Sequence, residues 1–128
     1  MPFDWSAFRT VAETLSQEVD KASRRSAISR AYYCAYHQAQ AHLSEHHNYQ
    51  VSEDKPAHDQ VWREFSRKGL SYREVWNKGD KLKKLRVDAD YRSDAAIGAD
   101  TAATSLKLAD RIIECLHQIH HKILSGQF

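Results

Sequence analysis

The stretch "RSAISRAYYCAYHQAQAHL", residues 25–43, decides the fold because it mixes alanine with aromatic side chains and contains no glycine or proline. Alanine is the strongest helix former and nothing in the stretch would end a helix, so it predicts one long, largely buried helix. The polar residues before it offer a cap at Asp20 or Ser23, and the helix is expected to run to about His46. Its predicted core stripe consists of Ile28, Tyr32, Ala35, Ala39 and Leu43.

Apolar residues at helical spacing predict a helix towards each end of the chain. Near the N-terminus, Asp4 or Ser6 can cap a first helix. Its apolar positions are Phe8, Val11, Ala12, Leu15 and Val19. The last helix is expected to start at Asp100 or Thr101 and to end at Gly126. Its wide apolar face consists of Ala102, Leu106, Ala109, Ile112, Ile113, Leu116, Ile119 and Ile123.

Two further helices are predicted between a polar loop and a connector at residues 91–100. Pro56 ends the loop and suits the first turn of a short helix that stops at Gly69. The apolar residues of this short helix are Val61, Trp62 and Phe65. A longer helix follows from Ser71, with Tyr72, Val75, Trp76, Leu82 and Leu85. Gly79 inside it costs about 1 kcal/mol relative to alanine, which predicts a bend or a split there.

The composition agrees with a helical fold. Only 4 of the 128 residues are glycine and 2 are proline, which suits long helices and suits tightly turned sheets poorly. A chain of this length is most simply one domain, residues 1–128. We therefore predict an all-α protein, an antiparallel bundle of four long helices with a short extra helix.

Charge and cysteine content narrow the class of protein. The formal net charge is +2, so the total charge does not require a polyanionic partner. Cys34 and Cys115 lie in apolar helical patterns and form no metal-like pair, which indicates buried, reduced thiols and disfavours a zinc site. The sequence has neither a membrane-length apolar run nor a leader-like N-terminus, so we expect a cytoplasmic protein with no membrane association and no cofactor.

Arg30 and His37 are the candidate catalytic residues. Seven residues turn a helix through about 700°, so the two side chains lie within about 20° of each other, with Tyr33 between them. On such a stripe a guanidinium can stabilise phosphate charge, and a histidine can move a proton from an RNA 2′-hydroxyl or to the leaving oxygen. Tyr33 can add a hydroxyl. A second pair, Arg111 and His117, is about 120° out of phase and shares no narrow stripe. The structural alternative is an arginine paired with a carboxylate and a packed histidine.

Three segments resemble HEPN-domain proteins, a family of small prokaryotic helical bundles. Residues 25–43 are similar to the family's second-helix pattern "R.AISRAYYA.FH.A". "LKKLRVDADYRSD", residues 82–94, is similar to its downstream "L..LR..ADY" segment, and "FDWSAFRTVAETL", residues 3–15, to its usual first helix. The motifs occur in the family's order and cover most of the chain.

The resemblance implies a homodimer in which two copies of an Arg–His motif, with four to six residues between, face one another across a cleft. In active members this cleft cuts RNA without a metal ion, often as a toxin that a nucleotidyltransferase-like antitoxin neutralises. Arg30 and His37, with six residues between them, match the motif. Ala31 departs from the polar residue that follows the arginine in many active members.

Arg86, Asp90 and Tyr91 are candidate substrate-binding residues. The resemblance implies that their segment lies near the Arg–His helix and lines the mouth of the cleft. The alternative is local ion pairing of Arg86 with Asp88 and Asp90 on a wet surface, where each pair contributes about 0 to 1 kcal/mol.

The sequence thus favours a metal-independent endoribonuclease of the HEPN type, with RNA as substrate and Arg30, His37 and Tyr33 at the site. Its expected role is the toxin of a toxin–antitoxin or defence system. The alternative, which Ala31 favours, is a catalytically silent HEPN module that binds a nucleotide, RNA or a partner protein. A third possibility is a scaffold subunit that is stable only with a nucleotidyltransferase-like partner.

Overall fold

Every regular element in residues 2–127, the range that this computed structural model describes, is a helix. In chain order the elements are α1 (Ala7–Ser16), α2 (Lys21–His47), α3 (Ala57–Ser66), the short 3₁₀ helix η1 (Leu70–Tyr72), α4 (Arg73–Tyr91) and α5 (Ala99–Leu124). The predicted all-α class is confirmed. α2, α4 and α5 are long, whereas α1 has 10 residues, the same number as α3, so the first of the four predicted long helices is short.

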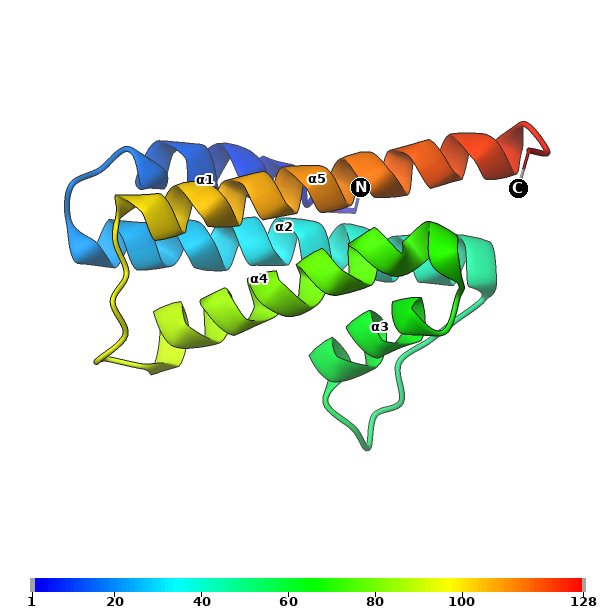
Figure 1. Cartoon of the computed structure of the whole chain (residues 1–128), viewed down its shortest axis with the longest axis horizontal. Helices are drawn as coiled ribbons and strands as arrows, with labels where there is room; N and C mark the ends of the chain where they lie inside the picture. The colour runs from blue at the N-terminus through cyan, green and yellow to red at the C-terminus, as the bar shows by residue number, and fades with distance from the viewer. Residues whose placement is uncertain (1, 128) are drawn as a thin grey trace.

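α2 lies at the centre of the arrangement. It packs against α1, α4 and α5, and less extensively against α3. Figure 1 shows that α2 and α5 run in the same direction, while α1 and α4 run in the opposite one. None of the helices in the described range combines the length and the apolarity that a membrane crossing needs.

Local signals explain both ends of α2. At its start, the Asp20 carboxylate accepts a hydrogen bond of 2.9 Å from the Ser23 backbone N–H, one of the two caps predicted. At its end, Asn48 adopts a left-handed conformation with φ of 50°, which asparagine tolerates better than most residues. Because neighbours cover several sides of α2, its buried residues extend beyond the predicted stripe. They include Ala27, Ala31, Cys34, Tyr36 and His42.

α1 ends earlier than the sequence predicts. Its last residue is Ser16, and residues 17–20 form the turn into α2. Val19 therefore lies outside the helix with 84% of its surface exposed, and Val11 is 44% exposed, so neither contributes to the core. Ala12 is the buried residue of α1.

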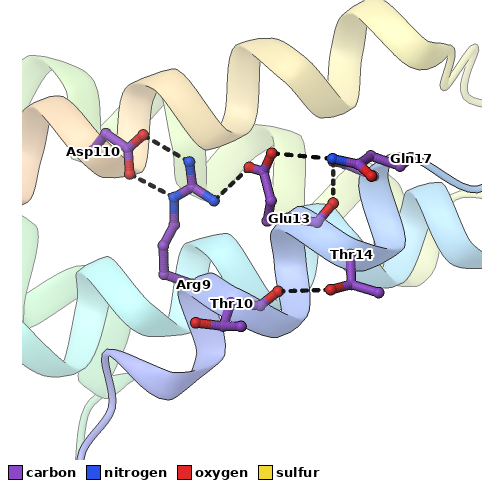
Figure 2. A network of polar contacts seen from close by, with 7 residues as sticks. Arg9, Thr10, Glu13, Thr14, Gln17 and Asp110 are labelled. Atoms are coloured by element: carbon purple, nitrogen blue, oxygen red, sulfur yellow. Dashed lines mark hydrogen bonds and ion pairs between the residues drawn. The ribbon is translucent and has the colours of Figure 1, made fainter.

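An arginine ties α1 to α5. Nε and Nη2 of Arg9 donate to the two carboxylate oxygens of Asp110 over 2.6 and 2.9 Å, and Nη1 donates to Glu13 over 2.8 Å (Figure 2). A bidentate pair of this kind fixes the orientation of the two helices as well as attracting them. The network therefore holds α1, and the N-terminal segment before it, against the rest of the molecule.

Gly79 lies inside α4, which continues through it, so a split at this glycine is wrong, while a bend there stays a prediction. The indole of Trp62 from α3 lies against this glycine: a Cβ at position 79 would be 2.5 Å from Cζ3 of the ring, well inside van der Waals contact. The glycine thus provides the space in which α3 packs on α4. Two predicted helix starts also shift slightly, since α4 begins at Arg73 and Gly98 caps α5.

Aromatic side chains fill the core between α2, α3 and α4. Tyr32, Phe65 and Tyr72 are fully buried, and Trp62 is 2% exposed. The Trp62 indole N–H donates to the Tyr32 hydroxyl over 3.0 Å, so two polar groups inside this core satisfy one another. The candidate site lies beside these rings.

Candidate functional site

Arg30 and His37 both lie on the side of α2 that faces the N-terminal segment. The guanidinium carbon of Arg30 is 4.6 Å from the centre of the Phe8 ring, and the His37 imidazole stacks on Trp5 with 3.5 Å between ring centres. Phe8 and Trp5 also contact one another, at 5.4 Å. The two predicted residues therefore share one stripe, and aromatic side chains cover part of it.

Arg30 has no carboxylate partner in the part of the chain that the structure describes. Its guanidinium rests on the Phe8 ring and, at 5.4 Å from the ring centre, on Tyr33, and it forms no hydrogen bond or ion pair with residues 2–127. A cation–π contact contributes about 0.5–1 kcal/mol at an exposed site and leaves the N–H donors free. The half-buried Arg30 is thus a cation whose donors are available to an anion.

The surroundings of His37 favour the neutral imidazole, the form that a general base needs. Its imidazole is half-buried, and burial, with the nearby charge of Arg30, lowers its pKa below the usual value. The ring is therefore neutral at pH 7 and able to accept a proton. Trp5 covers one face of the ring, so a ligand reaches the ring nitrogens from the edge or displaces the indole.

Tyr33 is in contact with both cationic parts of the site. Its ring centre lies 5.4 Å from the guanidinium carbon of Arg30 and 5.8 Å from that of Arg86. The same ring lies 6.0 Å from His37 and 5.7 Å from His58. Because these residues come from α2, α3 and α4, Tyr33 is the point at which the three helices meet in the site.

Arg86, Asp90 and Tyr91 lie in the C-terminal part of α4, beside α2. Arg86 is 6% exposed, and its guanidinium carbon is 5.1 Å from the Tyr32 ring centre and 5.6 Å from that of Tyr91. Its Nη1 lies 3.6 Å from the Asp90 carboxylate, which accepts a hydrogen bond of 3.2 Å from Ser29 of α2. The segment therefore reaches the Arg–His helix, and a local ion pair forms as well. The Nε of Arg86 has no hydrogen-bond partner in the described range.

His58 of α3 belongs to the site and was not predicted. Its Nδ1 shares a hydrogen bond of 2.7 Å with the Tyr32 hydroxyl. Burial, followed by the charges of Arg86 and Lys83, lowers its pKa to about 4, so the ring is neutral at pH 7. No spacing in the sequence marks this residue, because α3 meets α2 only through tertiary packing, which includes the contacts of His58 and Trp62 with Tyr32.

Cations outnumber anions around the two neutral imidazoles. Arg30 is unpaired within residues 2–127, Arg86 is held by aromatic rings and by Asp90, and Lys83 pairs with Asp59. Among the described residues, the side chains that cluster closely enough to hold a metal lie elsewhere. The arrangement is suited to binding an anion and transferring a proton beside it.

Comparison with known proteins identifies no relative. The chain matches no protein-family model, no curated protein and no solved structure. The resemblance to HEPN-domain proteins therefore stays a prediction, and the chemistry of the site rests on its own residues and geometry.

Proposed function

We propose that the protein is a metal-independent endoribonuclease of the HEPN type, with the family's antiparallel helical bundle, and that it acts as a toxin in a toxin–antitoxin or defence system. Arg30 anchors the phosphate, His37 transfers the proton and Tyr33 supports the site with its hydroxyl. One observation carries the proposal: within the described residues an unpaired guanidinium shares a helical stripe with a neutral imidazole.

The reaction follows from these two groups. Neutral His37 takes the proton of an RNA 2′-hydroxyl, the 2′-oxygen attacks the adjacent phosphorus, and the bond from phosphorus to the 5′-oxygen breaks. The products are a 2′,3′-cyclic phosphate and a 5′-hydroxyl, whose proton comes from a protonated imidazole. Arg30 stabilises the charge that develops on the phosphate oxygens, and the field of Arg86 adds to it.

A homodimer would supply the second imidazole. Two large aromatic side chains close to the site are exposed: Phe3, 54% exposed, contacts Trp5 and Phe8, and Tyr91, 74% exposed, contacts Arg86. Exposed aromatic residues beside a site are typical of an interface core. A second copy would bury these rings and bring two Arg–His pairs together, and a nucleotidyltransferase-like antitoxin would be the expected regulator.

Cleavage of RNA in EDTA tests the proposal. The purified chain should cut RNA and leave 2′,3′-cyclic phosphate ends, while His37→Ala abolishes cleavage and keeps the helical circular dichroism and the elution volume. His117→Ala, an exposed histidine of α5, is the matched control and should cut like the wild type. Intact RNA after incubation with a folded, dimeric wild type would rule out the nuclease.

The stacking of Trp5 on His37 favours a second candidate, the catalytically silent module. An indole 3.5 Å from the imidazole occupies one face of the ring, and Ala31 offers no polar group beside Arg30. In that case the folded protein binds RNA or a nucleotide, with Arg30→Ala weakening binding, and no product appears. Binding and cleavage assays on the same preparations separate the two functions.

A further inference from the structure

A second cluster of titratable side chains lies at the C-terminal end of α2. Glu45 and His46 are in the last turns of α2, and His120 is in the C-terminal part of α5. His46 is nine residues beyond His37, which is about 14 Å along the helix axis. The proposed ribonuclease uses none of the three.

We propose that Glu45, His46 and His120 bind a divalent transition-metal ion, preferably Zn²⁺, which joins the end of α2 to α5. One ligand atom from each of the three side chains lies within 4.8 Å of the other two. His46 Nε2 and His120 Nδ1 are 2.7 Å apart and share a hydrogen bond across the two helices. Two imidazoles and a carboxylate are a set that zinc uses where its fourth position is open to water.

Small movements convert the cluster into a tetrahedral site. Zinc–ligand bonds of about 2.0–2.1 Å separate neighbouring ligand atoms by about 3.3 Å. The two nitrogens therefore part by about 0.6 Å as the metal replaces the shared proton, and the carboxylate moves in by at most about 1.5 Å. Glu45 is exposed, so its side chain can change rotamer without disturbing the core.

The surroundings favour a cation. A solvent-open hollow between α2 and α5 gives an entry path and room for a metal-bound water. Its lining residues are Gln38, Ala41, His42, Glu45, Leu116, His117 and His120. Because α2 and α5 run in the same direction (Figure 1), the negative ends of both helix dipoles lie at this end of the molecule.

Buried neighbours hold His46 in place. Its ring centre is 4.6 Å from that of His42, which is 6% exposed and shares a hydrogen bond of 2.7 Å with the Tyr72 hydroxyl. The site therefore has a fixed support behind one ligand. Nitrogen ligands select transition metals over Mg²⁺ and Ca²⁺, which take oxygen ligands. The two cysteines are not part of the cluster.

Metal titration of the full chain tests the site. The protein is treated with EDTA, desalted and titrated with ZnCl₂ by calorimetry, with MgCl₂ as the comparison. We expect one Zn²⁺ per chain and, at a hundredfold excess over the Kd, a rise of roughly 10 °C in the melting temperature, because the ion binds the folded chain and not the unfolded one. Co²⁺ in its place should give the visible absorption of a tetrahedral site. Absence of a one-to-one complex overturns the proposal.

Variants locate the ion. Glu45→Gln and His120→Gln should each weaken Zn²⁺ binding by about tenfold or more, and Glu45→Gln, at an exposed position, should keep the fold even if His120→Gln does not. His121→Gln is the matched control, an exposed histidine next to His120, and should bind Zn²⁺ like the wild type. If all variants bind Zn²⁺ as tightly as the wild type, or if His121→Gln loses as much affinity as the other two, the ion binds at scattered surface positions and the proposed site is wrong. RNA cleavage by the metal-free protein is a separate result, so either proposal can fail alone.

Discussion

Replacing Gly79 by alanine should destabilise the protein, although the same change in an open helix stabilises it. In an exposed helix interior the substitution gains about 1 kcal/mol. Here the new Cβ would lie 2.5 Å from Cζ3 and 2.7 Å from Cδ2 of Trp62, and closer still to Cε3. These atoms belong to the rigid part of a buried indole, so the whole ring has to move by about 1 Å or more to restore contact distances of about 3.5–4.0 Å.

The expected size follows from three contributions. Forcing extra volume into a packed core costs about 1–3 kcal/mol, and a shifted indole loses its hydrogen bond to Tyr32, worth about 1 kcal/mol. The gain in helix propensity offsets about 1 kcal/mol of this. Gly79→Ala should therefore lower the free energy of unfolding by about 1–3 kcal/mol, read in urea as a lower midpoint with an unchanged m-value.

Two further variants make the Gly79→Ala result specific. Asn77→Ala, at an exposed position of α4, should leave the midpoint unchanged or raise it slightly, because it adds helix propensity without a collision. In a Trp62→Leu background, which lacks the six-membered ring, Gly79→Ala should become neutral or stabilising. A higher midpoint for Gly79→Ala in the wild-type background would refute the packing argument.

Three other perturbations have expected outcomes. The folded-state pKa of His58 is lowered to about 4, so from pH 7 to pH 5 the unfolded chain takes up a proton that the folded chain does not. After allowance for the partial exposure of His58, the free energy of unfolding should fall over that range by about 1 kcal/mol more in the wild type than in His58→Asn. Urea unfolding at the two pH values measures this difference, and equal midpoint shifts in the two proteins would contradict it. A double-mutant cycle of Arg9→Ala and Asp110→Ala should give a coupling of about 0.5–1 kcal/mol that shrinks in 1 M NaCl, and a salt-independent value would argue against an ion pair. Trp5→Ala should raise the pKa of His37 towards its usual value in an NMR titration, because it restores hydration, and an unchanged pKa would mean that the indole does not cover the ring in solution.

Interactions between residues close in the sequence determined where the main helices form and which face of α2 carries Arg30 and His37. Alanine-rich composition, the Asp20 cap and the absence of breakers were enough to predict α2, and the 3.6-residue turn alone puts Arg30 and His37 on one stripe. The all-α class followed in the same way. Hydrophobic periodicity was less reliable at the end of α1, where Val19 continues the pattern but the chain has already turned towards α2.

Contacts between distant segments were decided only by the tertiary structure. From the sequence alone, Gly79 indicates only a weakened helix, and the structure shows that it makes room for Trp62. Nothing in the sequence marks His58 as a site residue, and only the packing of α3 brings it to Tyr32. The stacking of Trp5 on His37 likewise depends on how the N-terminal segment lies across α2. Backbone hydrogen bonds and side-chain spacing act within a few residues and are readable along the chain, whereas packing and charge environment depend on which surfaces meet, and only the folded structure brings those surfaces together.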